Sequence, residues 1–551
     1  MLSQRRGRCC RVKCVDALGA VASTKDQVGI MERQNFPLDH LVQRIIVETE
    51  PLVTGLLAPS AYPHLVTSSI ELHETHISRI YLAGDYAYKV KKPVKNDFLD
   101  YSTLEKRRLA CDEELRLGAR YATDLYLAVV SITQDNGRIC IDGEGEAIEY
   151  AVKMHRFPGD ALLSHQLNEG KIGRSDLESI AVSIAAFHKN AAVSTKRDEQ
   201  TFREPLRQAL LNFQLLHGSE LGELQPQVQQ LEQWTQSVFD DSVVQFRHRL
   251  EDGFVRECHG DLHCDNVVKW QGNWIPFDGI EFNEALSWID VLDDACFLMV
   301  DLEARGNAPL ARTFMNAYLE CTGDYSDLKL LRWYAVYRAL VRAKVAMIRC
   351  SQLVSEPQSF QEQLTIAKHR IGLAHQYISH ETPTLWITHG LSGSGKTTGS
   401  AAIVALGAIR IRSDVERKRL FGMAATERSA DRVDRGIYTA EATQQTYDRL
   451  IALAQCILRS GYSVVVDATF LRHSDRTRFH QLASAEGVAF RILDFEADAQ
   501  TLRERIMARQ QASSDASDAD LAVLEAQLTS QESLTDQEQG FVVRDHKPEV
   551  V

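Results

Sequence analysis

The chain has 551 residues, which is enough for three or four domains of ordinary size or for two larger ones. Hydrophobic residues make up 44% and charged residues 25%, proportions that exclude a disordered polyampholyte, a collagen-like chain and a small disulfide-stabilised domain. The 75 acidic and 62 basic residues give a net charge of −13, which disfavours general binding to the phosphate backbone of nucleic acids.

The chain begins with a segment that differs from the rest. Residues 1–34 are rich in arginine and lack hydrophobic periodicity, so they predict a disordered basic leader, and Met31 offers an alternative start. No apolar run reaches the length of a membrane span or of a signal peptide, so we expect a cytoplasmic protein without membrane contact. The 11 cysteines form no C-x-x-C pair, and three histidines, at positions 155, 188 and 263, lack metal-ligand spacing and are interpreted as structural.

Residues 35–378 are interpreted as one domain, which opens with a β-hairpin over residues 80–91. The second strand of the hairpin alternates, so Lys89 and Lys91 are expected on the same face. Residues 104–118 predict a helix with glutamates on it. These glutamates are Glu105, Glu113 and Glu114.

A second motif in this domain has the pattern of a catalytic loop. It is His-Gly-Asp261-Leu-His-Cys-Asp-Asn266, in which Asp261 is suited to accept a proton and Asn266 to ligate Mg²⁺. A short apolar strand over residues 274–277 then ends at Asp278. A hairpin would bring Asn266 and Asp278 to one metal ion.

These segments resemble the aminoglycoside phosphotransferase and choline kinase branch of the protein-kinase-like fold. The resemblance implies that Lys89, with Lys91 as the second choice, pairs with the α- and β-phosphates of ATP. It also implies that Glu114 is the partner of the lysine and that Asp278 is the metal-binding aspartate. The glycine-rich loop of kinases is replaced by Glu-Thr-His-Ile-Ser at residues 74–78.

Further along the domain, acidic and basic side chains are interpreted as structural. Asp290 and Asp294 are four residues apart on a predicted helix, and arginines line a long predicted helix over residues 328–350. A further helical pattern over residues 360–378 is expected to pack between the two halves of the chain. Residues 379–384 are interpreted as a linker, because Pro383 disfavours continuation of that helix.

Residues 385–551 are interpreted as a second domain, which begins with a strand, a phosphate-binding loop and a helix. The loop fits G-x-x-x-x-G-K-[ST], where glycines allow the backbone to wrap a phosphate, Lys396 reaches the β- and γ-phosphates and Thr397 ligates Mg²⁺. The residues expected to contact the nucleotide are Gly390, Gly393, Ser394, Gly395, Lys396, Thr397 and Thr398.

Two further strands in this domain end next to charged residues. A strand over residues 409–412 runs into a helix on which Asp414 and Arg417 share a face, so Asp414 is a candidate base and Arg417 a candidate for holding the acceptor or a phosphate. A buried strand over residues 462–467 ends at Asp467, which is expected either to hold Mg²⁺ or to position the acceptor.

This segment resembles the small P-loop kinases, namely the 5′-polynucleotide kinase, zeta-toxin and gluconate/shikimate kinase group. The resemblance implies a lid helix with catalytic arginines, for which Arg509 is the first choice and Arg505 the second. From about residue 40 to 545 the chain resembles bacterial fusions of an aminoglycoside-phosphotransferase-like domain with an ATP-binding domain. The expected fold class is therefore α/β and α+β: a protein-kinase-like fold followed by a P-loop doubly wound parallel sheet.

The expected function is an ATP- and Mg²⁺-dependent phosphotransferase with two sites, each acting on a hydroxyl group of a small molecule. One alternative is a scaffold protein that binds nucleotide without transferring phosphate. Another is a nucleic-acid 5′-hydroxyl kinase in the second domain, because the helical residues 416–419 are basic and the P-loop resemblance permits this activity.

Overall fold

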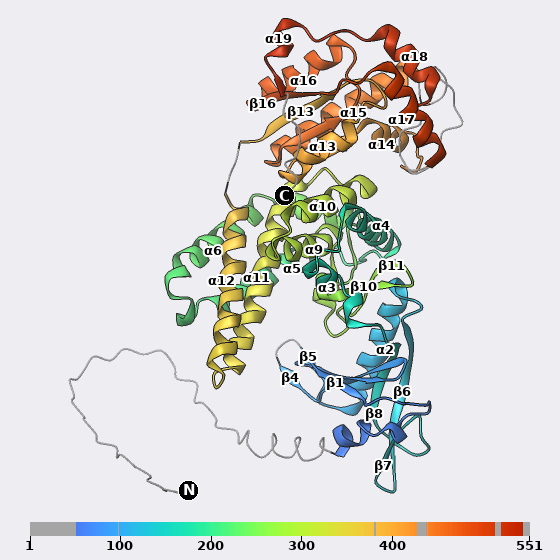
Figure 1. The fold of residues 1–551 in the computed structure, drawn as a ribbon. Coiled ribbons are helices and arrows are strands. Elements are labelled where there is room, and N and C mark those ends of the chain that lie inside the picture. The colour runs from blue at the N-terminus through green and yellow to red at the C-terminus, as the bar shows by residue number, and fades with distance from the viewer. Residues whose placement is uncertain are drawn as a thin grey trace, which may run out of the picture. The chain divides into compact units, whose positions relative to one another are not determined.

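The computed structural model describes residues 51–96, 99–379, 382–425, 427, 437, 439–512 and 519–543, so the predicted leader lies outside the described part of the chain. Contacts divide the chain at Val53, and Thr54–Val551 form one unit. We call residues 54–379 of this unit the N-terminal half and residues 382–543 the C-terminal half (Figure 1).

The N-terminal half starts with an antiparallel sheet of six strands, and the predicted hairpin at its centre is confirmed. The sheet packs against helix α2 (Leu104–Tyr121), which begins at the capping residue Thr103 and buries Cys111 and Glu114. This packing brings Glu114 to the lysine-bearing face of the sheet. In spatial order, the strands are β1 (Glu71–Glu74), β2 (Ser78–Ala83), β3 (Tyr86–Lys91), β8 (Ala147–His155), β6 (Tyr126–Asp135) and β7 (Arg138–Ile141).

The rest of this half is mainly helical. Its centre is α9 (Val291–Ala304), which is buried on all sides and is correspondingly hydrophobic around its circumference. The surrounding long helices are α4 (Arg174–Asn190), α5 (Glu199–Leu216), α6 (Gln225–Asp240), α10 (Ala308–Thr322), α11 (Leu328–Gln352) and α12 (Pro357–Tyr377). The shorter elements are η1 (Pro59–Ala61), β4 (Lys95–Asn96), β5 (Leu99–Asp100), η2 (Gly159–Ala161), α3 (Leu163–Asn168), η3 (Ser219–Leu224), α7 (Val243–Glu251), β9 (Val255–Glu257), η4 (Cys264–Asn266), β10 (Val267–Trp270), β11 (Asn273–Pro276), α8 (Glu284–Ser287) and β12 (Trp288–Asp290).

The expectation that the helix near residues 360–378 packs between the halves is wrong. This helix is α12, and it lies along α11 within the N-terminal half (Figure 1). Its Arg370 donates to Asp301 of α9 at 2.6 Å, and its Ala367 and Ile371 are buried in the same hydrophobic cluster as α9 and α11. The apolar face of α12 therefore completes the core of the N-terminal half.

The C-terminal half has a parallel sheet of five strands, which is the predicted P-loop arrangement. One of its inner strands contains three consecutive buried valines, Val464–Val466, as expected where helices cover both faces. In spatial order, the strands are β14 (Ile409–Arg412), β15 (Val464–Asp467), β13 (Thr384–His389), β16 (Ala489–Asp494) and β17 (Val542–Val543). The helices are α13 (Lys396–Ala405), α14 (Ser413–Leu420), α15 (Ala440–Arg459), α16 (His473–Glu486), α17 (Ala499–Ala512), α18 (Leu521–Ser530) and α19 (Asp536–Gln539).

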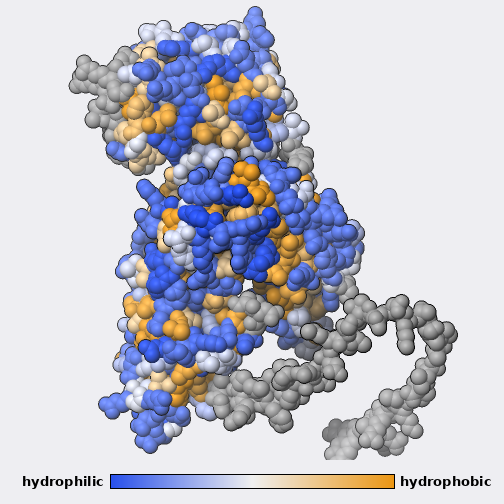
Figure 2. Space-filling view, turned by 180° about the vertical axis from the view of Figure 1, so that it is seen from behind, coloured by the Kyte–Doolittle hydropathy of each residue, from blue (hydrophilic) through white to orange (hydrophobic). Residues whose placement is uncertain are grey.

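The surface of the molecule mixes polar and apolar side chains. On the face in Figure 2, hydrophobic residues are interspersed among hydrophilic ones. Among the residues that the structure describes, no helix combines the length and the apolar composition that a membrane crossing requires.

Candidate functional sites

In the N-terminal half, two buried lysines on β3 share one glutamate. Lys89 donates to Glu114 at 2.8 Å and also pairs with Asp278. Lys91 pairs with Glu114 and with Glu281. The structure thus pairs Lys89 with Glu114, as the family resemblance implied, and it adds a contact of Lys89 with Asp278 and a second lysine–glutamate pair.

Electrostatics keep this cluster charged despite its burial. Burial lowers the pKa of Lys89, but Asp278 and Glu114 outweigh this effect and raise its pKa well above the ordinary value. Burial raises the pKa of Glu114, but the two lysines outweigh it and the pKa falls below its ordinary value. Of the five groups, Asp278 is the most accessible, with 38% of its side chain exposed. Asp278 is therefore the acid that a ligand reaches first.

The catalytic-loop residues lie next to this cluster. The predicted hairpin is confirmed as β10 and β11, and Phe277 N–H donates to the Asn266 carbonyl at 2.9 Å, which places Asp278 one residue beyond that contact. The Asn266 amide nitrogen donates to the Asp261 carboxylate at 3.2 Å. The side-chain oxygen of Asn266, which is an acceptor, therefore points away from Asp261. Asp278 has a φ of 61°, an uncommon left-handed conformation, and its N–H donates to the Tyr126 hydroxyl at 2.9 Å. The backbone is thus held in a conformation that aims the Asp278 side chain at Lys89.

Asp261 is ionised in this environment. Burial raises its pKa, but His263, whose Nε2 lies 3.3 Å from the carboxylate, and Arg342 outweigh it and hold the pKa below the ordinary range. An ionised carboxylate is the form that accepts a proton from an acceptor hydroxyl.

The catalytic loop is braced from behind by α9 and α11. The Asp294 carboxylate accepts from the N–H groups of His259 and Gly260, at 3.0 and 2.9 Å, and from His188 at 3.0 Å. Arg338 of α11 pairs with Asp293 at 2.7 Å and donates to the Gly260 carbonyl at 3.2 Å. The acids and arginines interpreted as structural therefore fix the loop that carries Asp261.

Two of the three histidines interpreted as structural also lie in groups with metal-ligand chemistry. His188, Cys258 and Asp294 form one such group, and His263, Asp265 and Asp301 form another. Both ring nitrogens of His188 already have protein partners, the Tyr318 hydroxyl at 2.8 Å and Asp294. These hydrogen bonds account for the burial of His188 without a metal ion.

In the C-terminal half, the phosphate-binding loop joins β13 to α13. Gly390 has a φ of 141°, and a Cβ there would lie 2.4 Å from the Phe495 carbonyl oxygen, so only glycine fits. Gly395, with a φ of 95°, is the N-cap of α13. Lys396 donates from Nζ to the Gly390 and Leu391 carbonyls, at 3.0 and 2.8 Å. The loop therefore has the conformation and the cation that a phosphate requires.

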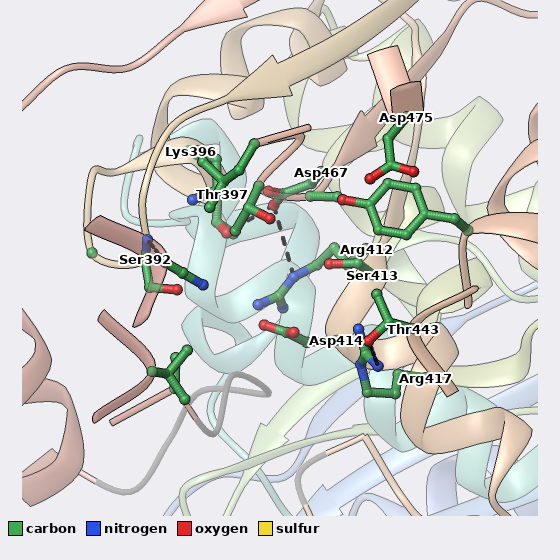
Figure 3. Close-up of a pocket in the computed structure, with 18 of the residues that line it drawn as sticks. Ser392, Lys396, Thr397, Arg412, Ser413, Asp414, Arg417, Thr443, Asp467 and Asp475 are labelled. Atoms are coloured by element: carbon green, nitrogen blue, oxygen red, sulfur yellow. Dashed lines mark hydrogen bonds and ion pairs between the residues drawn. The ribbon is translucent and has the colours of Figure 1, made fainter. Parts of the chain in front are cut away.

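The two predicted magnesium ligands of this half are in contact. Thr397 donates from its hydroxyl to Asp467 Oδ2 at 2.8 Å. The parallel register of β14 and β15 places Arg412 beside Asp467, and Arg412 Nε lies 4.0 Å from that same oxygen (Figure 3). A hydroxyl and a carboxylate at one position are the oxygen ligands that Mg²⁺ prefers.

A cavity of about 460 Å³ opens over this loop. Figure 3 shows Asp414, Arg417 and Asp475 in its lining together with Lys396 and Asp467. Arg417 donates to the Ile437 carbonyl at 3.0 Å and to the Thr443 hydroxyl at 3.2 Å. Burial raises the pKa of Asp475 above its ordinary value. Predicted loop residues in the lining are Gly393, Gly395, Lys396, Thr397 and Thr398, whereas Gly390 and Ser394 lie outside it.

Comparison with known proteins gives a family model for part of the chain and relatives that match most of it. A protein-family model described as an AAA domain matches residues 385–534. Rv2004c of Mycobacterium tuberculosis is 30% identical over 461 residues, which cover 83% of this chain and 89% of that protein. The chain belongs to the family of this mycobacterial protein.

Solved structures similar to the chain cover part of it. A choline/ethanolamine kinase family protein from Mesorhizobium loti covers 59% of this chain and 99% of its own, with 13% identity and a TM-score of 0.35. A gluconokinase from Sinorhizobium meliloti covers 30% of this chain and 82% of its own, with 19% identity and a TM-score of 0.21.

The two arginines expected in the lid both belong to helix α17. Arg505 lines the cavity and donates to the Gly393 carbonyl at 3.2 Å, whereas the side chain of Arg509, the first choice, lies outside the described residues. Lining residues that no motif indicated include Arg412, Thr443, Tyr447, Arg472, Asp475 and Gln527. For Arg412, Arg472 and Asp475 the sequence offers one signal, which is their position near the ends of β14 and β15 or the start of a helix.

Proposed function

We propose that the chain is an ATP-dependent phosphotransferase with two sites, each of which transfers the γ-phosphoryl group of Mg-ATP to a hydroxyl group of a small molecule. One observation carries the proposal: each half brings together a lysine for the phosphates, oxygen ligands suited to Mg²⁺ and a separate carboxylate. In the N-terminal half these are Lys89, Asn266 with Asp278, and Asp261. In the C-terminal half they are Lys396, Thr397 with Asp467, and Asp414.

In the N-terminal half, the oxygen of the acceptor hydroxyl forms a bond to the γ-phosphorus, and Asp261 accepts the proton of that hydroxyl. The bond from this phosphorus to the bridging oxygen breaks, and ADP leaves. Lys89, kept cationic by its acidic partners, neutralises phosphate charge, while Asp294 keeps the loop of Asp261 in place. Asn266 and Asp278 would hold Mg²⁺, which supplies further neutralisation of the transferred group.

In the C-terminal half, the same bonds form and break, and Asp414 takes the acceptor proton. Lys396 and Arg505 border the loop where the phosphates bind, and Arg417 lines the part of the cavity that also contains Asp414. The cavity of about 460 Å³ fits a small molecule. The burial of Glu416, Arg417 and Lys418 of α14 argues against nucleic-acid binding by residues 416–419.

The test is a screen of a metabolite pool with γ-labelled ATP, using the full chain and two variants. We expect Asp261→Ala to remove one group of labelled products and Lys396→Ala another. Asp252→Asn is the control, because Asp252 is exposed at the C-terminal end of α7, outside the catalytic loop. A pool that receives no label from the wild-type protein, or a product pattern unchanged in both variants, would refute the proposal and favour a nucleotide-binding scaffold.

A further inference from the structure

Helix α10 of the N-terminal half completes the edge of the C-terminal sheet. Strand β14 is the edge strand, and its exposed backbone groups need partners. Asn316 of α10 supplies them: its side-chain oxygen accepts from Arg410 N–H at 2.7 Å, and its amide nitrogen donates to the Ala408 carbonyl at 3.3 Å. This contact fixes α10 against the strand that leads to Asp414.

Glu320 lies one helical turn after Asn316, on the same face of α10. Its carboxylate accepts from Arg412 Nη1 at 3.1 Å and lies 3.6 Å from Arg410 Nη2. The Glu320 side chain is 18% exposed, and its backbone carbonyl also accepts from Arg419. A single carboxylate from the N-terminal half therefore pairs with two arginines of the C-terminal half.

Both arginines reach the predicted magnesium ligands. Arg412 Nε lies 4.0 Å from the Asp467 oxygen that accepts from Thr397, and Arg410 Nη1 donates to the Thr397 carbonyl at 3.1 Å. A second cavity, lined by both halves, contains Glu320, Arg410, Arg412 and Thr397. Glu320 thus contacts one arginine that lies next to Asp467 and another that contacts the Thr397 backbone.

We infer that Glu320 is a positioning residue of the C-terminal site, supplied by the N-terminal half, and that it keeps Arg412 from occupying Asp467 in place of Mg²⁺. The inference rests on the proposed function of that site. In the part of the chain that the structure describes, Arg412 forms ion pairs with both Glu320 and Asp467, so Glu320 competes with Asp467 for its charge. Without Glu320, two neighbouring guanidinium groups lose their shared counter-charge, and Arg412 pairs more strongly with Asp467.

The experiment is calorimetry of ADP binding to the full-length protein over a series of Mg²⁺ concentrations. The component that Lys396→Ala removes belongs to the C-terminal site. We expect Glu320→Ala to raise the Mg²⁺ concentration at half-maximal binding of this component about tenfold, within the usual range of coupling between sites. Glu320→Gln, which keeps a hydrogen-bond acceptor, should raise it less, and ADP binding in EDTA should change by less than about twofold.

Two further variants separate positioning from a general structural effect. Glu178→Ala is the matched control, because Glu178 lines the same cavity and pairs with Arg174 at 2.7 Å. Adding Arg412→Met to Glu320→Ala should restore the Mg²⁺ dependence, since the competing cation is gone. A Glu320→Ala midpoint equal to that of Glu178→Ala, or no restoration in the double variant, overturns the inference. If no Lys396-dependent component exists, the proposed function of the site fails and the inference fails with it.

Discussion

The two lysines of β3 are predicted to differ in role, although both contact Glu114. Lys89 also pairs with Asp278, the accessible acid next to Asn266, whereas Lys91 pairs with Glu281, whose side chain is 3% exposed. We therefore expect Lys89→Met to weaken nucleotide binding at the N-terminal site more than tenfold and Lys91→Met to change it by less than about threefold.

The effect of Lys91→Met is expected on stability instead. It leaves Glu281 with the Tyr101 hydroxyl, at 2.6 Å, as its described partner. Breaking a buried ion pair by removing one member destabilises a protein by about 3–5 kcal/mol, because the remaining charge stays buried. Combining Lys91→Met with Glu281→Gln removes that charge as well, so the double variant should be less destabilised than the sum of the two single variants by about 1.5 kcal/mol or more.

Both effects are measurable on the full chain. Urea unfolding, with amide hydrogen exchange of β2 and β3 as the local readout, gives the free energies, and ADP calorimetry gives the affinities. The Lys396→Ala background confines the binding signal to the N-terminal site. The assignment of roles fails if Lys91→Met weakens ADP binding as much as Lys89→Met does, or if it destabilises the fold by less than about 1 kcal/mol.

Three further predictions concern metal binding, the catalytic loop and acid stability. Asp467→Asn should raise the Mg²⁺ requirement of ADP binding at the C-terminal site more than tenfold, and an unchanged titration would contradict its role. Asp294→Asn should lower kcat of the N-terminal transfer with little change in KM and destabilise the fold by about 1–3 kcal/mol in urea unfolding, because two loop N–H groups lose a charged acceptor. Burial raises the pKa of Glu538, but Arg476 outweighs it and lowers the pKa from 4.5 to about 2. Its contribution to stability is therefore complete above pH 4.5 and lost as the pH falls toward 2, and Glu538→Gln should flatten thermal stability across that interval.

Local patterns predicted the parts of the sites that are contiguous in sequence. The phosphate-binding loop, the catalytic loop and the β10–β11 hairpin are each fixed by short-range geometry, so glycine spacing and strand length were sufficient. The same holds for Asp467, because the carboxyl end of a buried parallel strand lies at the edge where the loop also lies.

Contacts between distant segments could not be predicted in this way. Glu281 follows Lys91 by 190 residues, and Arg412 follows Glu320 by 92 residues, and no periodicity relates the two members of either pair. The basic run in α14 shows the same limit. Its charges suggested a helix that could follow a nucleic-acid backbone, but Glu416 is buried between Arg419 and Arg449, so the run forms ion pairs inside the fold.

In both proposed sites, the residues expected to bind phosphate or Mg²⁺ already contact other groups of the protein, and these contacts affect which ligands bind tightly. On the proposed function, Mg²⁺ alone would have to displace Lys89 from Asp278, and ATP alone would place phosphate charge next to the Asp278 carboxylate. With both bound, the phosphates would attract Lys89 while Asp278 would hold the cation, so each ligand would remove the obstacle to the other. In the C-terminal half, Lys396 donates to loop carbonyls and Thr397 donates to Asp467, so the same exchange of partners applies. Because protein contacts are replaced rather than added, this geometry favours the Mg–nucleotide complex over either component alone.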